Sequence, residues 1–297
     1  MHFPVMLRES IEYLAVRPES VYLDATCGLG GHTQALAERL KTGFVIACDR
    51  DSESLERAKR NLEGVADRVR FYRGPFSTLD AALASFQVER VDGILADLGV
   101  SRYQLTDPER GFSLMADGPL DMRLDRSSGE PASDLVNFTA EKALADLIYQ
   151  FGEERRSRRI ARAIVRARPV HTTLQLARVI EQAVGRTGRL HPATQTFMAL
   201  RLAVNDEPGE LDRFLDLAPR LVAPGGRIVI MTFMSLEDRA VKRKFQALAQ
   251  SGAASLLTRH VVRPGSQEIE ENPPSRSAKL RALQMTGGMG KEQTGKE

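Results

Sequence analysis

The chain has 297 residues, 42% of them hydrophobic and 27% charged, with a formal net charge of +3, which is ordinary for a globular protein of one large domain and an insertion. It has no apolar run near the ~20 residues of a membrane span and no signal-peptide layout at its start, so we expect a cytoplasmic protein. Its two cysteines, Cys27 and Cys48, fit neither a disulfide framework nor a metal-ligand spacing, so no metal is expected.

The first part of the chain alternates between strand-like and helix-like segments. Strands are predicted at residues 21–26, 43–49, 69–74 and 91–99, and helices at 31–40, 51–62 and 77–86. Short apolar runs separated by amphipathic helices are typical of βαβ units. The pattern therefore predicts an α/β fold with a parallel, doubly wound sheet.

This alternation stops after Gly99 and resumes with a helix at 209–221, a Pro-Gly-Gly turn at 224–226 and a strand at 227–233. A helix at 236–250 and strands near 254–259 and 277–285 follow, giving seven strands with an antiparallel last pair. We therefore expect a discontinuous sheet domain, residues 1–104 and 206–297, interrupted by a helical insertion at 105–205.

A glycine-rich turn joins the first strand to its helix. Gly28, Gly30 and Gly31 are expected to bend the backbone with positive φ and to let a ligand approach without a Cβ in the way. Asp49 ends the next strand, where a carboxylate can bind both hydroxyls of a ribose. A tight structural turn would contain the same glycines, but strand, turn, helix, strand and acid together predict a nucleoside cofactor.

The glycine spacing bears on which cofactor binds. A dinucleotide site has a third glycine at the position that Thr33 occupies here, which makes a hydride-transfer enzyme the weaker alternative. The run from Asp24 to Gly30, DATCGLG, instead resembles the first motif of S-adenosylmethionine-dependent methyltransferases.

Asp97 ends the fourth strand. In an open α/β sheet the ligand lies at the carboxyl ends of the strands, so this side chain is expected to face the pocket at the glycine turn. The alternative is a loop cap. A polar loop broken by Gly and Pro follows at residues 98–113 and contains Gln104, and loops of this kind often carry function.

Further motifs extend in order along nearly the whole chain. They are 24–32 (DATCGLGGH), 97–101 (DLGVS), 104–105 (QL), 109–113 (ERGFS), 118–123 (GPLDMR), 152–155 (GEER), 191–194 (HPAT), 199–205 (ALRLAVN), 224–226 (PGG), 235–239 (SLEDR) and 275–281 (SRSAKLR). With these motifs the chain resembles the MraW/RsmH family of bacterial methyltransferases of small-subunit ribosomal RNA. The resemblance implies a class I, Rossmann-like fold, S-adenosyl-L-methionine as cofactor, and methylation of the exocyclic N4 of a decoding-centre cytosine in 16S rRNA.

The resemblance also implies a set of cofactor contacts. They fall on Gly30, Gly31, His32, Asp49, Phe76, Asp97 and Gln104. Phe76 could instead be a core aromatic, and His32 a helix cap. Asp97 is also the candidate catalytic residue, because an acceptor near the target amine would stabilise its developing positive charge. The 16S rRNA of the small subunit is the expected partner, and the protein is expected to be a monomer or a homodimer.

Arginines recur at helical spacing within the predicted insertion. Those predicted to share one helix face are Arg155, Arg158, Arg159, Arg162 and Arg166. Ile160 and Ile164 would occupy the opposite, buried face. The stripe suits RNA phosphates, and Arg155, Arg158, Arg162 and Arg166 are its candidate RNA-binding residues. The alternative is a solvated surface helix balanced by neighbouring glutamates.

Some positions depart from the family pattern. Met234 stands where a His is common, and Arg102 where a Ser is usual. Both belong to the expected substrate side of the site. Two other function classes stay open: a DNA amine methyltransferase, and a non-catalytic RNA-binding assembly factor.

Overall fold

The computed structural model describes residues 4–186, 188 and 190–287. The chain divides into two compact units, Met1–Gly99 with Glu210–Glu297 (unit 1) and Val100–Gly209 (unit 2). Unit 1 contains the sheet, and the segment expected as the insertion, 105–205, falls within unit 2. No helix in the described ranges is long and apolar enough to cross a membrane.

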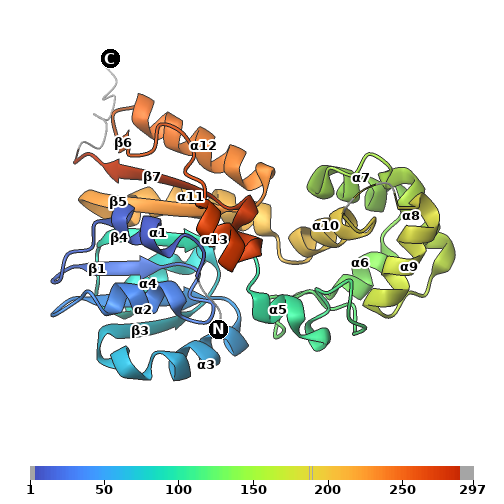
Figure 1. Cartoon of the computed structure of the whole chain (residues 1–297), viewed down its shortest axis with the longest axis horizontal. Helices are drawn as coiled ribbons and strands as arrows, with labels where there is room; N and C mark the ends of the chain where they lie inside the picture. Colours follow the sequence, from blue (N-terminus) through green and yellow to red (C-terminus); the bar gives the residue numbers. More distant parts are fainter. Residues whose placement is uncertain (1–3, 187, 189, 288–297) are drawn as a thin grey trace, which may run out of the picture. The chain divides into compact units, whose positions relative to one another are not determined.

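Unit 1 is built on a seven-stranded sheet in the order β3-β2-β1-β4-β5-β7-β6 (Figure 1). The strands are β1 (Val21–Asp24), β2 (Phe44–Asp49), β3 (Val69–Arg73), β4 (Val91–Asp97), β5 (Val222–Thr232), β6 (Ala254–Leu256) and β7 (Lys279–Met285). β1 to β5 pair in parallel, while β7 runs antiparallel to both β5 and β6. The predicted class I methyltransferase sheet, with its antiparallel last pair, is confirmed.

Helices cover both faces of this sheet because apolar side chains of the central strands point to both sides. One face packs against α1 (Leu7–Leu14), α2 (Gly31–Ala37) and α3 (Ser52–Asn61). The other packs against α4 (Leu79–Ser85), α11 (Glu207–Leu221) and α12 (Ser235–Gln250). Neighbouring residues alternate between the two cores, as Tyr22 and Leu23 of β1 do.

Strand lengths place the acidic residues around the glycine turn. β1 is central and short, and its last residue, Asp24, pairs with Ala47 of β2 and Leu95 of β4. Both neighbouring strands continue past that pairing and end at Asp49 and Asp97. Asp49 and Asp97 therefore lie at the ends of the two strands that flank β1, one on each side of the glycine turn that follows β1.

Three elements of unit 1 differ from the expectation. β5 begins at Val222 rather than at Arg227, because the Pro-Gly-Gly segment forms an irregularity in its pairing with β4 instead of a separate turn. Helix α1 and the short helix α13 (Ser266–Glu271) were not predicted from the sequence.

Unit 2 is helical and has its own hydrophobic core. Its helices are α5 (Arg102–Thr106), α6 (Ala132–Phe138), α7 (Glu141–Gly152), α8 (Ser157–Ala167), α9 (Thr173–Val184) and α10 (Thr194–Val204). Ile148, Ile160 and Ile164 are completely buried in that core. The Asn205 side chain anchors the loop that contains Met122 and Leu124 to this core. It accepts a hydrogen bond from the Leu124 N–H and donates one to the carbonyl oxygen of Met122 (both 2.7 Å).

Candidate functional site

The glycine turn of unit 1 lies between β1 and α2. Gly28 (φ 53°) and Gly30 (φ 91°) adopt the left-handed conformation, as predicted. The same prediction is wrong for Gly31, which begins α2 and whose missing Cβ leaves room for the Pro4 ring, 3.0 Å from where that atom would lie. Apart from its chain neighbours, a Cβ on Gly28 would come within 4 Å only of the Thr26 carbonyl oxygen (3.9 Å), so the turn is open at Gly28.

Asp49 is oriented by the backbone around it. Its Oδ2 accepts a hydrogen bond from the Gly28 N–H (2.8 Å), and its Oδ1 accepts one from the Asp51 N–H (2.9 Å). Burial raises the pKa of Asp49 to about 6, while these hydrogen bonds act in the opposite direction. Each carboxylate oxygen has a second lone pair, so the group is held in an orientation that can accept from a ribose diol.

Asp24 lies beneath the turn and is only 1% exposed. Its Oδ2 accepts from the Thr33 hydroxyl (2.6 Å), and its Oδ1 accepts from the Thr26 N–H (3.1 Å). Thr33 thus supplies a hydrogen bond at the position where a dinucleotide site has a glycine. Burial raises the pKa of Asp24 to about 6, although its hydrogen bonds lower it. From the sequence, Asp24 could be recognised only as an acidic residue before the turn. Its burial could not be predicted, because it depends on tertiary packing.

Asp97 presents an acceptor that nothing in the described structure satisfies. Its Oδ1 is enclosed and has no hydrogen-bond partner among the described residues. Burial first, and then the negative charges of Asp24, Glu237 and Glu268, raise the pKa of Asp97 to about 8. The Asp97 side chain is nevertheless 23% exposed, and its Oδ2 lies 3.8 Å from Nδ1 of His32. Because Oδ1 accepts no backbone N–H, the loop-cap alternative has no support.

The described start of the chain packs onto the turn. Nε2 of His32 donates to the carbonyl oxygen of Val5 (3.0 Å), and the Met6 N–H donates to Oε1 of Glu268 on α13 (2.6 Å). Glu237 of α12 is also buried and accepts from the Phe233 N–H (3.1 Å). Glu237 lies in the 235–239 motif, but sequence reasoning gave it no role, and Glu268 lies in none of the motifs, because nothing local links α12 or α13 to the turn.

The remaining two expected cofactor residues have other contacts. The Phe76 ring lies 4.9 Å from the ring of Phe214 and packs against the core, in agreement with its alternative as a core aromatic. Gln104 lies in unit 2, where it completes a capping box at the start of α5: the Ser101 N–H donates to its Oε1 (2.7 Å). The structure thus collects five of the expected residues around the turn in unit 1, namely Gly30, Gly31, His32, Asp49 and Asp97.

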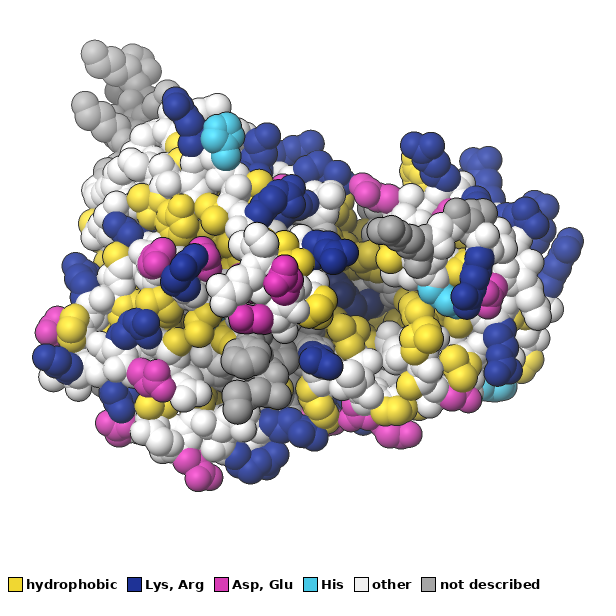
Figure 2. All heavy atoms as spheres, in the orientation of Figure 1, with side chains coloured by type: hydrophobic (Ala, Val, Ile, Leu, Met, Phe, Trp, Pro, Cys, Tyr) yellow, Lys and Arg dark blue, Asp and Glu magenta, His cyan; other side chains and the backbone are white. Residues whose placement is uncertain are grey.

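The predicted arginine stripe is realised only in part. Helix α8 begins at Ser157, so placing Arg155 on that helix face was wrong: α7 ends at Gly152 with Glu153 in the left-handed conformation, and Arg155 lies in the turn between the helices. Four arginines of α8 are exposed, namely Arg158, Arg159, Arg162 and Arg166. Ile160 and Ile164 are buried opposite them, as predicted. Figure 2 shows Lys and Arg side chains, in dark blue, gathered over the part of unit 2 that contains α8.

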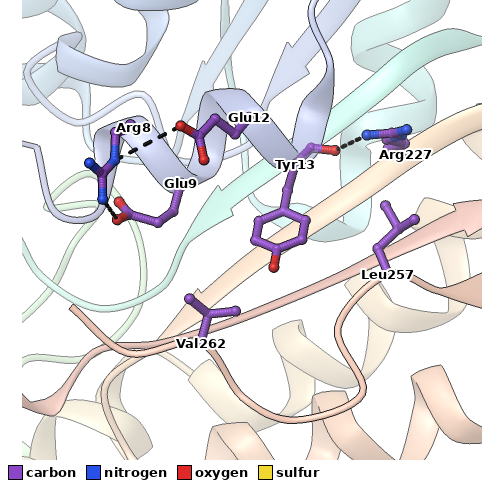
Figure 3. Close-up of a pocket in the computed structure, with 7 residues that line it drawn as sticks. All are labelled: Arg8, Glu9, Glu12, Tyr13, Arg227, Leu257 and Val262. Carbon is purple, nitrogen blue, oxygen red and sulfur yellow. Dashed lines mark hydrogen bonds and ion pairs between the residues drawn. The ribbon is translucent and has the colours of Figure 1, made fainter. Parts of the chain in front are cut away.

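A separate surface pocket of about 360 Å³ lies in unit 1 and contains none of the expected site residues (Figure 3). Its charged groups are already paired: Arg8 contacts Glu9 (2.9 Å), and Arg227 donates to the carbonyl of Tyr13 (2.9 Å). Within the described ranges, no group of three or more His, Cys, Asp or Glu side chains could hold a metal ion.

Residues 1–286 match the family described as the MraW methylase family. Two similar proteins are both named "Ribosomal RNA small subunit methyltransferase H". The one from Solibacter usitatus (strain Ellin6076) is 64% identical over 96% of this chain and 100% of its own length, and the one from Acidobacterium capsulatum is 48% identical over 95% and 98%. Among solved structures, an rRNA methylase from Streptococcus thermophilus aligns with a TM-score of 0.48 and 14% identity over 96% of this chain and 99% of that chain.

The geometry of unit 1 fits a nucleoside cofactor with a cationic end. The turn is open at Gly28, Asp49 is oriented to accept from hydroxyls, and Asp97 offers an enclosed, unsatisfied acceptor. The chain belongs to the MraW methylase family, and its cofactor is S-adenosyl-L-methionine.

Proposed function

We propose that this protein transfers a methyl group from S-adenosyl-L-methionine to the exocyclic N4 of a decoding-centre cytosine in 16S rRNA. The observation that carries the proposal is the unsatisfied Oδ1 of Asp97, at the carboxyl end of β4 beside the glycine turn. The names of the similar proteins support small-subunit ribosomal RNA as the substrate. With this substrate we expect the protein to act in the cytoplasm, on the small ribosomal subunit or its RNA.

The cofactor contacts are proposed residue by residue. Asp49 accepts from the ribose hydroxyls, since both of its oxygens are already oriented by backbone N–H groups. Asp97 faces the cationic methionine end. The other proposed contacts are Gly30, Gly31, His32, Phe76 and Gln104. Phe76 would contact the adenine from the position at which its ring packs on Phe214.

Asp97 is also the proposed catalytic residue. An exocyclic cytosine amine is a poor nucleophile because its lone pair is delocalised into the ring. A carboxylate that accepts a hydrogen bond from the amine localises that lone pair and stabilises the positive charge that develops on nitrogen. S-adenosyl-L-methionine would supply the methyl group: the N4–methyl bond would form in line as the sulfur–methyl bond breaks, S-adenosyl-L-homocysteine would leave, and the surplus N4 proton would pass to solvent. The enzyme's main contribution is to position the amine, with Asp97 held at the end of a rigid strand.

We propose that the insertion, residues 105–205, recognises the RNA. Its exposed arginines on α8, Arg158, Arg162 and Arg166, would contact phosphate oxygens, with Arg155 contributing from the preceding turn. Phosphate contacts provide affinity and register but little sequence information. The choice of cytosine must therefore depend on other groups. Arg162 also lies 3.4 Å from Glu141, an exposed pair that RNA would have to displace.

Mass spectrometry of 16S rRNA nucleosides from cells with and without this gene tests the proposal. The expected result is loss of one N4-methylcytidine when the gene is absent. Unchanged ribosomal RNA together with methylation of duplex DNA by the purified protein would favour the DNA amine methyltransferase. If calorimetry detected no binding of S-adenosyl-L-methionine, the non-catalytic assembly factor would be the better account.

A further inference from the structure

Phe138 is a large apolar side chain that unit 2 leaves in solvent. It is the last residue of α6, and its side chain is 82% exposed. Single apolar residues on a surface are common in proteins, so exposure alone assigns no role to this ring. Two further features distinguish Phe138: the backbone on both sides of it is held in place, and the exposed arginines of α8 lie close to it in the fold.

The chain on either side of this ring is fixed by the segment that follows α8. Arg168 donates from Nε to the carbonyl oxygen of Val136 (2.8 Å) and from Nη2 to that of Thr139 (2.5 Å). The Asn137 side chain accepts from the Val170 N–H and donates to the Val170 carbonyl oxygen (both 2.8 Å). The ring is therefore presented on a rigid support. A group that is already held in position loses little conformational entropy when it binds a partner.

Two contacts bring α8 next to the connection that carries Phe138. Nε of Arg162 lies 3.4 Å from Oε1 of Glu141, which is three residues after Phe138. Arg168, directly after α8, binds carbonyl groups on both sides of the ring. Arg166 is exposed and lies about one helical turn beyond Arg162, between these two contacts. The fold of unit 2 therefore places one exposed aromatic ring and two exposed guanidinium groups at neighbouring positions.

We propose that Phe138, Arg162 and Arg166 bind an unpaired nucleotide of the RNA, distinct from the cytosine that is methylated. Its base stacks on the Phe138 ring, and the flanking phosphates contact the two arginines. The inference rests on the proposed function, because it takes RNA as the substrate. Stacking on a side chain requires a base whose face is free, so this surface selects single-stranded RNA. Contacts between arginine and phosphate alone do not make that selection.

The charge of this surface favours RNA over a second copy of the chain. A symmetric dimer would bring the same arginines of both copies together, and like charges across an interface are unfavourable. RNA phosphates instead neutralise them. The pair between Arg162 and Glu141 is exposed and contributes little to stability, so a phosphate displaces Glu141 at small cost.

Fluorescence anisotropy with two labelled strands of equal length tests the inference: single-stranded oligouridine, and a ribose-phosphate strand without bases. The wild-type protein is expected to bind oligouridine about tenfold more tightly, through stacking of a base on the ring. Phe138→Ala should remove this preference and leave the slope of log affinity against log salt concentration unchanged. Arg166→Ala should instead weaken binding of both strands alike and reduce that slope.

Further substitutions separate stacking from a general apolar contact. Phe138→Tyr keeps an aromatic face and should bind like the wild type, whereas Phe138→Leu keeps only an apolar side chain and should bind like Phe138→Ala. Leu256→Ala is the control in unit 1: Leu256 is also an exposed apolar residue, and its loss should leave the preference for oligouridine unchanged. Because the Phe138 side chain is exposed, these variants are expected to fold. In methylation assays with small ribosomal subunits, Phe138→Ala should raise KM and leave kcat and the Kd of the cofactor unchanged.

The outcomes that contradict the inference differ from those that contradict the proposed function. A wild-type protein without preference for oligouridine, or a preference that Phe138→Ala retains, overturns the inference. A lower kcat in Phe138→Ala would mean that the ring contacts the target cytosine itself. Loss of a dimer in Phe138→Ala, measured by sedimentation equilibrium, would assign the surface to a second copy of the chain. Each of these results leaves the proposed function standing, which fails only if the wild-type protein methylates no small-subunit RNA.

Discussion

Replacing Asp97 with Asn is expected to stabilise the cofactor-free protein at alkaline pH while abolishing methyl transfer. The pKa of Asp97 is raised from 3.8 to about 8, so between these values the folded protein holds a proton that the unfolded chain has lost. The free energy of unfolding therefore falls as the pH rises through this interval. The asparagine variant has no ionisable group at this position, so its free energy of unfolding does not fall for this reason as the pH rises.

The size of the stability difference follows from the pKa shift of Asp97 and from the environment of its side chain. One pKa unit corresponds to about 1.4 kcal/mol, which makes about 6 kcal/mol the upper bound for the whole shift. The Asp97 side chain is 23% exposed, and solvent screening at the exposed part reduces the cost of ionisation. We therefore expect the variant to gain about 1–3 kcal/mol at pH 8.5 and almost nothing at pH 4.5.

Urea denaturation followed by circular dichroism, at several pH values between 4.5 and 8.5, measures this difference. The matched control is Asp92→Asn, near the opposite end of β4. It should destabilise the protein at every pH, because Asp92 pairs with Arg17 and accepts from the Val21 N–H. A difference between wild type and Asp97→Asn that stays constant across the pH range would refute the reasoning, since it would mean that Asp97 binds no extra proton in the folded state.

Three further predictions concern the other parts of the account. Asp49→Ala should weaken binding of S-adenosyl-L-methionine by roughly 1–3 kcal/mol in calorimetry, through loss of charge-assisted hydrogen bonds, and unchanged affinity would remove Asp49 from the site. Arg158→Glu should lower the affinity for RNA and reduce the slope of log affinity against log salt concentration by about one, whereas the same charge reversal at exposed Lys242 of α12 should change neither. Equal effects of the two substitutions would mean that α8 is a solvated surface helix that does not bind RNA. Ile164→Ala should cost about 2–4 kcal/mol of stability in unit 2 without changing cofactor affinity, and a parallel loss of cofactor binding would argue against separate cores.

The sheet and its acidic strand ends could be predicted because their signals are local. The strands are short apolar runs bounded by turn residues, and Asp49 and Asp97 are simply the residues at which two of them end. In parallel strands such ends lie on one edge, so their sequence positions already place them near the glycine turn. The positive φ of Gly28 and Gly30 has a similarly local cause.

The rest depends on contacts between distant segments. Glu268 meets the Met6 N–H across almost the whole chain, and no periodicity or motif marks that pairing. Gly31 resembles its neighbours in sequence, but its role is to leave room for Pro4. Arg155 has the helical spacing of the stripe, but α8 starts only at Ser157. In each case a tertiary contact or a helix boundary overrides the local pattern.

The measurement that tests the central claim most directly uses small ribosomal subunits from cells that lack this gene. These particles are incubated with the purified protein and S-adenosyl-L-methionine that carries a deuterated methyl group, and their RNA is digested to nucleosides for mass spectrometry. The account predicts deuterium in N4-methylcytidine from 16S rRNA, and none with the Asp97→Ala variant. Label in a different nucleoside, or unlabelled RNA in the presence of bound cofactor, would contradict it.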